Sequence, residues 1–115
     1  MKQKIDFLAV GDTVTDAFIE LIDANVHCNI NNDDCTISMP FGAKIPYKSV
    51  DVLRGVGNAA NAAVAAGRLG LTSALIAIVG NDEEGQRIHE HFKSESVMND
   101  FISTQDGVPT NYHYV

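Results

Sequence analysis

The sequence is poor in basic residues. It has 8 Lys and Arg against 15 Asp and Glu in 115 residues, which gives a net charge of -7. Such an excess of negative charge repels the phosphates of nucleic acids and anionic membrane surfaces. No apolar run approaches the roughly 20 residues that a membrane-spanning helix needs. The start, MKQKIDFLAV, resembles a secretion signal only superficially, because Asp6 interrupts its apolar stretch. We therefore expect a cytoplasmic protein with no nucleic-acid or membrane partner.

The sequence also has few cysteines. Cys28 and Cys35 are separated by NINNDD, a run of turn-forming residues that would place the two thiols across a hairpin. Two cysteines without further ligands nearby do not make a zinc site. A disulfide between them is geometrically possible, but disulfides are rare in a reducing compartment. We expect two reduced thiols and no metal site.

What is present is an alternation of short apolar segments with helical ones. Residues 5–10 (IDFLAV) predict a strand buried on both faces, as in a parallel sheet. From residue 47 onward the pattern indicates strand, helix, strand, helix and strand, which is typical of an α/β fold with crossover helices. These segments are 47–53, 58–69, 72–79, 83–93 and 100–103, and a further strand is expected at 110–115. Gly70 is the expected C-terminal cap of the first helix and Asp82 the N-cap of the second.

Residues 14–53 interrupt that alternation. Five of the six residues at 29–34 are Asn or Asp, and the segments on both sides predict a hairpin with this loop at its tip. Residues 14–22 favour a strand, with a single amphipathic helical turn as the alternative. The sequence therefore predicts an α/β core of few strands and a small β element projecting from it.

Residues 55–70 (GVGNAANAAVAAGRLG) join a predicted strand to a helix of small residues. Glycine permits a tight turn and close approach of a ligand to the backbone, and the helix N-terminus offers unpaired N–H groups. Asn58 and Asn61 lie one helical turn apart on the same side. Each amide can donate and accept hydrogen bonds, which suits sugar hydroxyls. The structural alternative is that Asn58 caps the helix and the glycines only form the turn.

The same turn satisfies the dinucleotide-binding fingerprint. Gly55, Gly57 and Ala60 have its spacing, and Asp82 or Glu83 follows the next predicted strand. That fingerprint usually opens the first strand–helix–strand unit, whereas here a hairpin-rich segment precedes it. An NAD(P)-binding oxidoreductase fragment is therefore the less favoured hypothesis.

Four short motifs spread along the whole chain share their residues with one known family. They are VGDTVTD at 10–16, GVGNAAN with its helix ending in RLG at 55–70, VGND followed by a glycine at 79–85, and GVPT at 107–110. Together they resemble the ribokinase/PfkB family of carbohydrate and nucleoside kinases. The resemblance implies that residues 1–115 are the N-terminal part of a single ribokinase-like domain. Its α/β core would be an incomplete Rossmann-type sandwich, and residues 14–53 would form a β lid.

The resemblance assigns substrate contacts to four residues. Asp16 would accept hydrogen bonds from two hydroxyls, because a carboxylate can bind a diol with both oxygens. Gly57 would let the backbone approach the substrate. Asn61 would bind a further hydroxyl, and Asn58 would contribute. Without the family, Asp16 would be interpreted as a solvated carboxylate at a strand end.

The histidines carry no motif of their own. His89 and His91 are two residues apart on a predicted helix, so they do not face each other. His113 alternates with Tyr112 and Tyr114 on a predicted strand. None of them has the companions that a metal site or a catalytic triad would need.

The match departs from the family at two positions and lacks one motif. Val56 stands where the family has the first of two adjacent glycines, and Val14 stands where ribokinase itself has Asn, which weakens a claim of ribose specificity. The family's catalytic base is an Asp in a glycine-rich GAGD motif at a helix N-terminus, and no such motif occurs here. ATP and Mg²⁺ are implied by the family, and we expect their ligands mainly outside this sequence. We expect no catalytic and no metal-binding residue within it.

Several functions fit these observations. The leading hypothesis is the substrate-binding N-terminal portion of an ATP-dependent kinase that phosphorylates a hydroxyl of a sugar or nucleoside and is inactive alone. The first alternative is a non-catalytic sugar- or nucleoside-binding module. The second is a dimerisation module, since the family's lid often forms dimer contacts and a homodimer through the lid is implied. The oxidoreductase fragment comes last.

Overall fold

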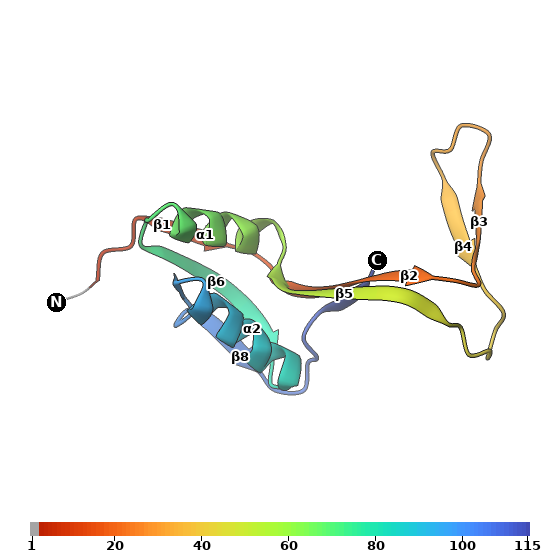
Figure 1. Ribbon diagram of the computed structural model, residues 1–115. Helices are drawn as coiled ribbons and strands as arrows, with labels where there is room; N and C mark the ends of the chain where they lie inside the picture. Colours follow the sequence, from red (N-terminus) through yellow and green to blue (C-terminus); the bar gives the residue numbers. More distant parts are fainter. Residues whose placement is uncertain (1–2) are drawn as a thin grey trace.

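The computed structural model describes residues 3–115, which form nine strands and two helices (Figure 1). In chain order they are β1 (Phe7–Val10), β2 (Val14–Leu21), β3 (Asn25–Cys28), β4 (Cys35–Ser38), β5 (Tyr47–Val56), α1 (Asn58–Arg68), β6 (Ser73–Gly80), α2 (Glu83–Ser94), β7 (Val97–Met98), β8 (Ile102–Gln105) and β9 (Tyr112–Tyr114). Both helices lie close to their predicted bounds. The molecule is elongated, with extents of 59 × 34 × 22 Å and a radius of gyration of 17.8 Å, against about 13 Å for a compact chain of this length.

The core is a parallel sheet covered by two helices. β1 pairs with β6, and β6 pairs with β7 along its first half and with β8 along its second. Helices α1 and α2 pack on one face, where the alanines of α1 let its backbone come close to the sheet. The buried cluster there comprises Ala9, Ala60, Ala63, Leu75, Ala77, Val79, Ile88, Phe92, Val97 and Ile102. This arrangement confirms the predicted α/β core.

The opposite face of the parallel sheet is open. It carries four aliphatic side chains that alternate with the buried ones, and their exposed fractions are 48% for Leu8, 69% for Val10, 40% for Ile76 and 60% for Ile78. Parallel sheets are normally covered on both faces. The sandwich is therefore incomplete, as the sequence predicts.

A second sheet, which we call the lid sheet, extends from the core in the order β5-β2-β9 (Figure 1). β2 forms as a strand over Val14–Leu21, so the helical alternative for this segment is wrong. β2 and β5 are antiparallel, and β9 runs parallel to β2.

The lid sheet corrects the expected strand order. We expected residues 47–53 to open the parallel α/β alternation, but β5 pairs only with β2 among the described strands. The predicted strand at 110–115 forms as β9 and pairs with β2 in the lid sheet. The reason lies in composition: β5 reads YKSVDVLRGV, with charged residues among apolar ones, whereas a core parallel strand is a nearly continuous apolar run.

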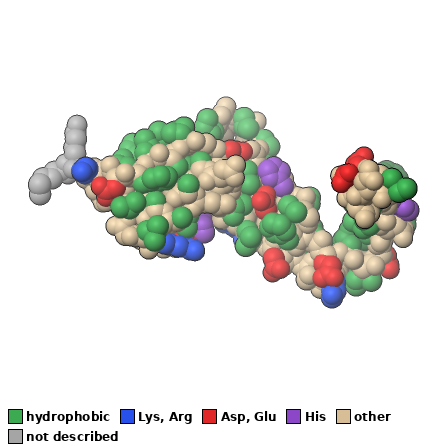
Figure 2. All heavy atoms as spheres, turned by 90° about the horizontal axis from the view of Figure 1, so that it is seen from above, with side chains coloured by type: hydrophobic (Ala, Val, Ile, Leu, Met, Phe, Trp, Pro, Cys, Tyr) green, Lys and Arg blue, Asp and Glu red, His purple; other side chains and the backbone are tan. Residues whose placement is uncertain are grey.

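Strands β3 and β4 form a hairpin, which we call the arm (residues 25–38). It stands away from the lid sheet, and Figure 2 shows it as a separate lobe, apart from the body where hydrophobic side chains gather. The side chain of Asn29 accepts hydrogen bonds from the backbone N–H groups of Asn31 and Asp33, which closes the polar tip. This confirms the predicted hairpin.

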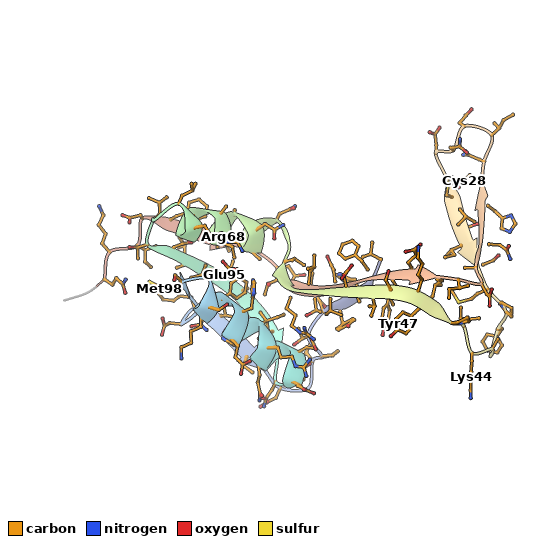
Figure 3. The ribbon with its side chains drawn as sticks, in the orientation of Figure 1. Cys28, Lys44, Tyr47, Arg68, Glu95 and Met98 are labelled. Carbon is orange, nitrogen blue, oxygen red and sulfur yellow. A yellow bond between two sulfur atoms is a disulfide. The ribbon has the colours of Figure 1, made fainter. Side chains whose placement is uncertain are left out.

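The arm also overturns one prediction. Cys28 and Cys35 are joined by a disulfide, so the expectation of two reduced thiols is wrong (Figure 3). The two residues lie directly opposite each other in the β3–β4 ladder, and their Cα atoms are 4.0 Å apart. Opposed residues of this kind are the closest pairs in an antiparallel ladder. This proximity favours the disulfide although disulfides are rare in a reducing compartment.

Asp82 connects the second helix to the rest of the fold. Its side chain accepts a hydrogen bond from the Gly85 N–H at 2.8 Å, which confirms it as the N-cap of α2. It also accepts bonds from the hydroxyl and the backbone N–H of Thr110, each at 2.7 Å. The bonds from Thr110, with that from Gly85, lower the pKa of Asp82 below its usual value. The same carboxylate thus fixes both the start of α2 and the approach to β9.

Candidate functional site

A hollow of about 410 Å³ lies where β1 ends, α1 begins and β9 passes. We call it the β1–α1 hollow. It is lined by Val10, Gly11, Asp12, Val14, Gly57, Asn58, Ala59 and His113. It therefore lies beyond the carboxyl end of β1, the usual place for ligands in α/β folds.

Two glycines allow the walls of this hollow to approach each other. A Cβ at Gly57 would lie 3.0 Å from the backbone oxygen of Asp12, and the φ of Gly57 is 117°, which other residues rarely adopt. A Cβ at Gly11 would lie 2.8 Å from the Cβ of Ala59. The turn after β1 and the turn before α1 are consequently in backbone contact.

Carboxylates dominate the polar chemistry around the hollow. Asp12 accepts hydrogen bonds from the backbone N–H of Thr13 and from the side-chain amide of Asn111, both at 2.9 Å. Asp16 Oδ1 lies 3.1 Å from Nδ1 of His113. Each acid is therefore held by a residue of the 111–113 segment. Both oxygens of Asp12 are engaged, whereas only Oδ1 of Asp16 is in contact with His113.

The structure separates the four residues assigned from the sequence. Gly57 and Asn58 line the hollow, and Asp16 lies beside it on β2, in contact with the lining residue His113. Gly57 occupies the N-cap position of α1, and no side chain caps that helix, so the alternative that Asn58 is the cap is wrong. Asn61 lies elsewhere, on the wall of a second hollow.

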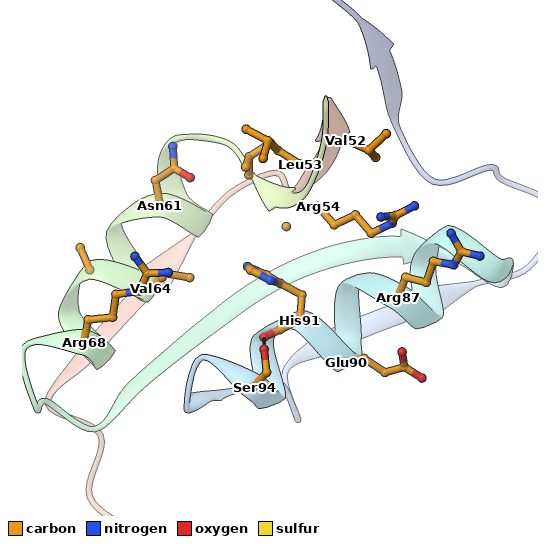
Figure 4. A pocket seen from close by; sticks show the side chains of 13 residues that line it. Val52, Leu53, Arg54, Asn61, Val64, Arg68, Arg87, Glu90, His91 and Ser94 are labelled. Carbon is orange, nitrogen blue, oxygen red and sulfur yellow. Dashed lines mark hydrogen bonds between the residues drawn. The ribbon is translucent and has the colours of Figure 1, made fainter. Parts of the chain in front are cut away.

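The second hollow, of about 990 Å³, lies between α1, α2 and the end of β5 (Figure 4). Asn61, Val64 and Arg68 line it from α1, and Arg87, Glu90, His91 and Ser94 line it from α2. Its arginines already have partners. Figure 3 shows Arg68 beside Glu95, to which it donates two hydrogen bonds of 2.8 and 2.6 Å, and Arg54 donates two to Glu84.

The pair of Arg68 with Glu95 shifts the pKa of both partners, and the pair of Arg54 with Glu84 lowers the pKa of Glu84. Hydrogen bonding to Glu95 raises the pKa of Arg68, and the bond from Arg68 lowers the pKa of Glu95. Burial acts to raise the pKa of Glu84, but hydrogen bonds from Arg54 and Thr15 outweigh it and the net shift is downward. The guanidinium groups are thus committed to structural pairs that hold the helices against β5 and against each other.

Two residues of the hollow were missed in the sequence. Asp12 lies in the motif at 10–16 but has no assigned role there, and His113 belongs to no motif. The alternation of residues 112–114 placed His113 on one face of a strand, but nothing in the sequence showed that this strand pairs with β2. The pairing of Asp16 with His113 spans 97 positions and arises from that register.

The described residues offer little cationic or metal-binding chemistry at the β1–α1 hollow. Within residues 3–115 no group of three His, Cys, Asp or Glu side chains could hold a metal ion. The β1–α1 hollow is lined by a carboxylate, an amide and an imidazole, with no Lys or Arg, and such a lining disfavours phosphate groups. The dinucleotide hypothesis also loses its basis, because the strand before the glycine turn belongs to the lid sheet instead of the parallel sheet.

No helix of the described part is long and apolar enough to cross a membrane.

Comparison with models of known protein families shows to which family the chain belongs. Residues 16–115 match the model of the pfkB family carbohydrate kinases. The chain belongs to the pfkB carbohydrate kinase family. None of the curated protein sequences matches it with significance.

Solved kinase structures share the fold of this pfkB-family chain. Arabidopsis thaliana ribokinase, solved with ribose and ATP, superposes with a TM-score of 0.75 at 20% identity, covering 98% of this chain and 32% of the ribokinase. For the Halothermothrix orenii fructokinase the TM-score is 0.67 at 22% identity, with 96% and 33% covered. For the Methanocaldococcus jannaschii nucleoside kinase it is 0.68 at 21% identity, with 94% and 31% covered. The chain thus spans about a third of the length of these kinases.

Proposed function

We propose that this chain supplies the substrate-binding part of an ATP-dependent kinase that phosphorylates a hydroxyl of a neutral sugar or nucleoside. The observation that carries the proposal is the β1–α1 hollow. There the Gly57 turn, the Asn58 amide and the Asp16–His113 pair meet at the carboxyl end of β1. The solved kinases that share this fold are named as a ribokinase, a fructokinase and a nucleoside kinase. Their names support a substrate that carries hydroxyl groups.

Each residue has a separate task in this proposal. Asp16 accepts a hydroxyl hydrogen bond through the oxygen that His113 leaves available, and the Asn58 amide donates or accepts another. Gly57 lets a sugar lie against the backbone, since no Cβ intervenes. Asn61 lines the second hollow, and its backbone N–H makes the first hydrogen bond of α1, to the Gly57 oxygen at 2.8 Å.

The reacting phosphate and its catalytic base belong to other parts of the kinase in this proposal. ATP bound with Mg²⁺ would supply the phosphoryl group, whose transfer depends on cationic and backbone N–H groups around the phosphates. The lining of the β1–α1 hollow has no Lys or Arg for that purpose. We therefore take residues 1–115 as the N-terminal part of one ribokinase-like domain, with residues 14–53 in the lid that β9 completes, and expect no phosphoryl transfer by the chain alone. The proposal keeps the expected cytoplasmic location.

Calorimetric titration tests the proposal. The chain is titrated with D-ribose, D-fructose and adenosine, and we expect at least one of them to bind. The substitution Asp16→Asn should weaken that binding about tenfold or more, because it replaces one acceptor oxygen with a donor and removes a charge-assisted hydrogen bond. Glu20→Gln, on the same face of β2 but remote from the hollow, is the matched control. Unchanged affinity in Asp16→Asn would refute the assignment. A coupled assay with ATP and Mg²⁺ checks the expected inactivity.

A homodimer through the lid is a second candidate function. The lid sheet exposes Phe18 on one face, with an exposed fraction of 42%, and Val50 and Tyr114 on the other, with 41% and 76%. Exposed aromatic side chains in a sheet are typical of contact surfaces. Light scattering should then give twice the chain mass of 12.4 kDa, and Phe18→Ser should return the protein to the monomer. A monomeric wild-type chain would exclude this candidate.

A further inference from the structure

His113 lies on β9 of the lid sheet and is one of the residues that line the β1–α1 hollow. Its Nδ1 lies 3.1 Å from Asp16 Oδ1, and the exposed fraction of its side chain is 56%, against 24% for Asp16. The imidazole therefore covers part of the carboxylate, and more than half of the imidazole stays exposed.

The bond to Asp16 fixes the tautomer of the neutral imidazole. A carboxylate only accepts hydrogen bonds, so Nδ1 must carry the proton and donate to Oδ1. The other ring nitrogen, Nε2, is then without a proton and can only accept. The pair accordingly presents two neighbouring acceptors, Asp16 Oδ2 and His113 Nε2.

We propose that His113 is a substrate-contacting residue that selects a neutral vicinal diol, with Nε2 accepting a hydrogen bond from one hydroxyl while Asp16 Oδ2 accepts one from its neighbour. This inference rests on the proposed function. Two hydroxyl hydrogens on adjacent carbons match two adjacent acceptors. A carboxylate or phosphate group on the substrate has no hydrogen to donate here when ionised, and it would also face Asp12 and Asp16 with no Lys or Arg in the lining.

Substitutions at position 113 distinguish the roles of the two ring nitrogens of His113. Asparagine places an amide N–H near the position of Nδ1, so His113→Asn can keep the bond to Asp16 while it removes the acceptor at Nε2. Glutamine reaches further, so His113→Gln can place an amide oxygen near the position of Nε2. His113→Ala removes both groups. His27→Asn, the same replacement at an exposed histidine of the arm, is the matched control.

The expected pattern follows from the acceptor role. His113→Asn and His113→Ala should each weaken binding of the best neutral probe among D-ribose, D-fructose and adenosine by about three- to tenfold, the usual range for one neutral hydrogen bond. His113→Gln should recover part of that loss, and His27→Asn should bind as the wild type does. Ribose 5-phosphate should bind more weakly than ribose. If His113→Asn binds as tightly as the wild type, His113 only positions Asp16 and the inference is overturned.

Nuclear magnetic resonance supplies an independent readout. The nitrogen shifts of the His113 ring should show the Nδ1–H tautomer in the free chain, and the Nε2 resonance should move when the neutral probe is added. The Nε2–H tautomer would overturn the inference without a binding measurement. If Asp16→Asn loses binding while the substitutions of His113 leave binding unchanged, the proposed function still holds and the inference about His113 is refuted. If the chain binds none of the neutral probes, both the proposed function and the inference about His113 are refuted.

Discussion

At the scale of single residues, the site depends on one backbone conformation more than on any side chain. The φ of Gly57 is 117°. A Cβ atom at this position would also lie only 3.0 Å from the backbone oxygen of Asp12 in the neighbouring turn. Both conditions select glycine, and both arise because the turn after β1 and the turn before α1 touch. A departure from the family at Val56 does not disturb them, since the glycine that the contact requires is the next residue.

Replacing Gly57 should therefore destabilise the fold. We expect Gly57→Ala to lower the free energy of unfolding by about 2–4 kcal/mol, through backbone strain together with the contact to Asp12. Urea denaturation followed by circular dichroism measures this. Gly42→Ala is the matched control, because Gly42 also has a positive φ, of 73°, but nothing lies within 4 Å of its Cβ position. Equal losses in the two variants would show that the close approach of the turns contributes nothing.

Part of the site could be predicted from the sequence at this scale, and part could not. Gly57, Asn58 and the cap Asp82 belong to local motifs whose conformations are set by neighbouring residues. The contacts of His113 and Asn111 with Asp16 and Asp12 join residues 97 and 99 positions apart. Such contacts depend on strand register, which a sequence specifies only through the whole sheet.

At the scale of elements, the helices were easier to predict than the partners of the strands. The caps and composition of α1 and α2 are local properties, so their bounds followed from the sequence. The apolar run of β6 likewise indicated a buried parallel strand. By contrast, β5 and β9 have mixed composition, and their common partner β2 lies far from both in the chain. The pattern showed that they were strands and did not show which sheet they join.

The arm is the element whose stability depends most on a covalent bond. All residues of β3 and β4 are exposed, and an isolated two-stranded hairpin is marginal in water. A disulfide that closes so short a loop contributes about 2 kcal/mol by the chain-entropy estimate. Reduction should therefore open the arm while the core and lid sheets persist.

Hydrogen–deuterium exchange with and without a phosphine reductant measures this effect. We expect faster exchange of the amides of residues 25–38 after reduction and unchanged exchange in α1 and β6. In the double variant Cys28→Ser, Cys35→Ser, the arm should exchange fast under both conditions, which controls for other effects of the reductant. Protection of the arm that survives reduction would mean that its ladder and the Asn29 tip suffice without the disulfide.

At the scale of the whole molecule, the distribution of apolar side chains is one-sided. Helices α1 and α2 bury one face of the parallel sheet, whereas the other face exposes Leu8, Val10, Ile76 and Ile78. A contiguous aliphatic face of this kind promotes association. The chain spans about a third of the kinases whose fold it shares, and the face open here is one that a doubly covered α/β sheet would bury.

The isolated chain should therefore associate through this face, and polar residues there should prevent it. We expect the double substitution Ile76→Thr, Ile78→Thr to reduce both the binding of a hydrophobic dye and the concentration-dependent association seen by sedimentation. Threonine keeps the β-branched shape that suits a strand, and both side chains are already partly in water, so unfolding stability should change by only about 1 kcal/mol. Leu75→Thr, on the covered face of the same strand, is the contrasting variant. It should lower the free energy of unfolding by about 3 kcal/mol or more, because it leaves a cavity and a hydroxyl in the core. If the double variant associates as strongly as the wild type, the contact lies on the lid sheet or the arm instead of the open face.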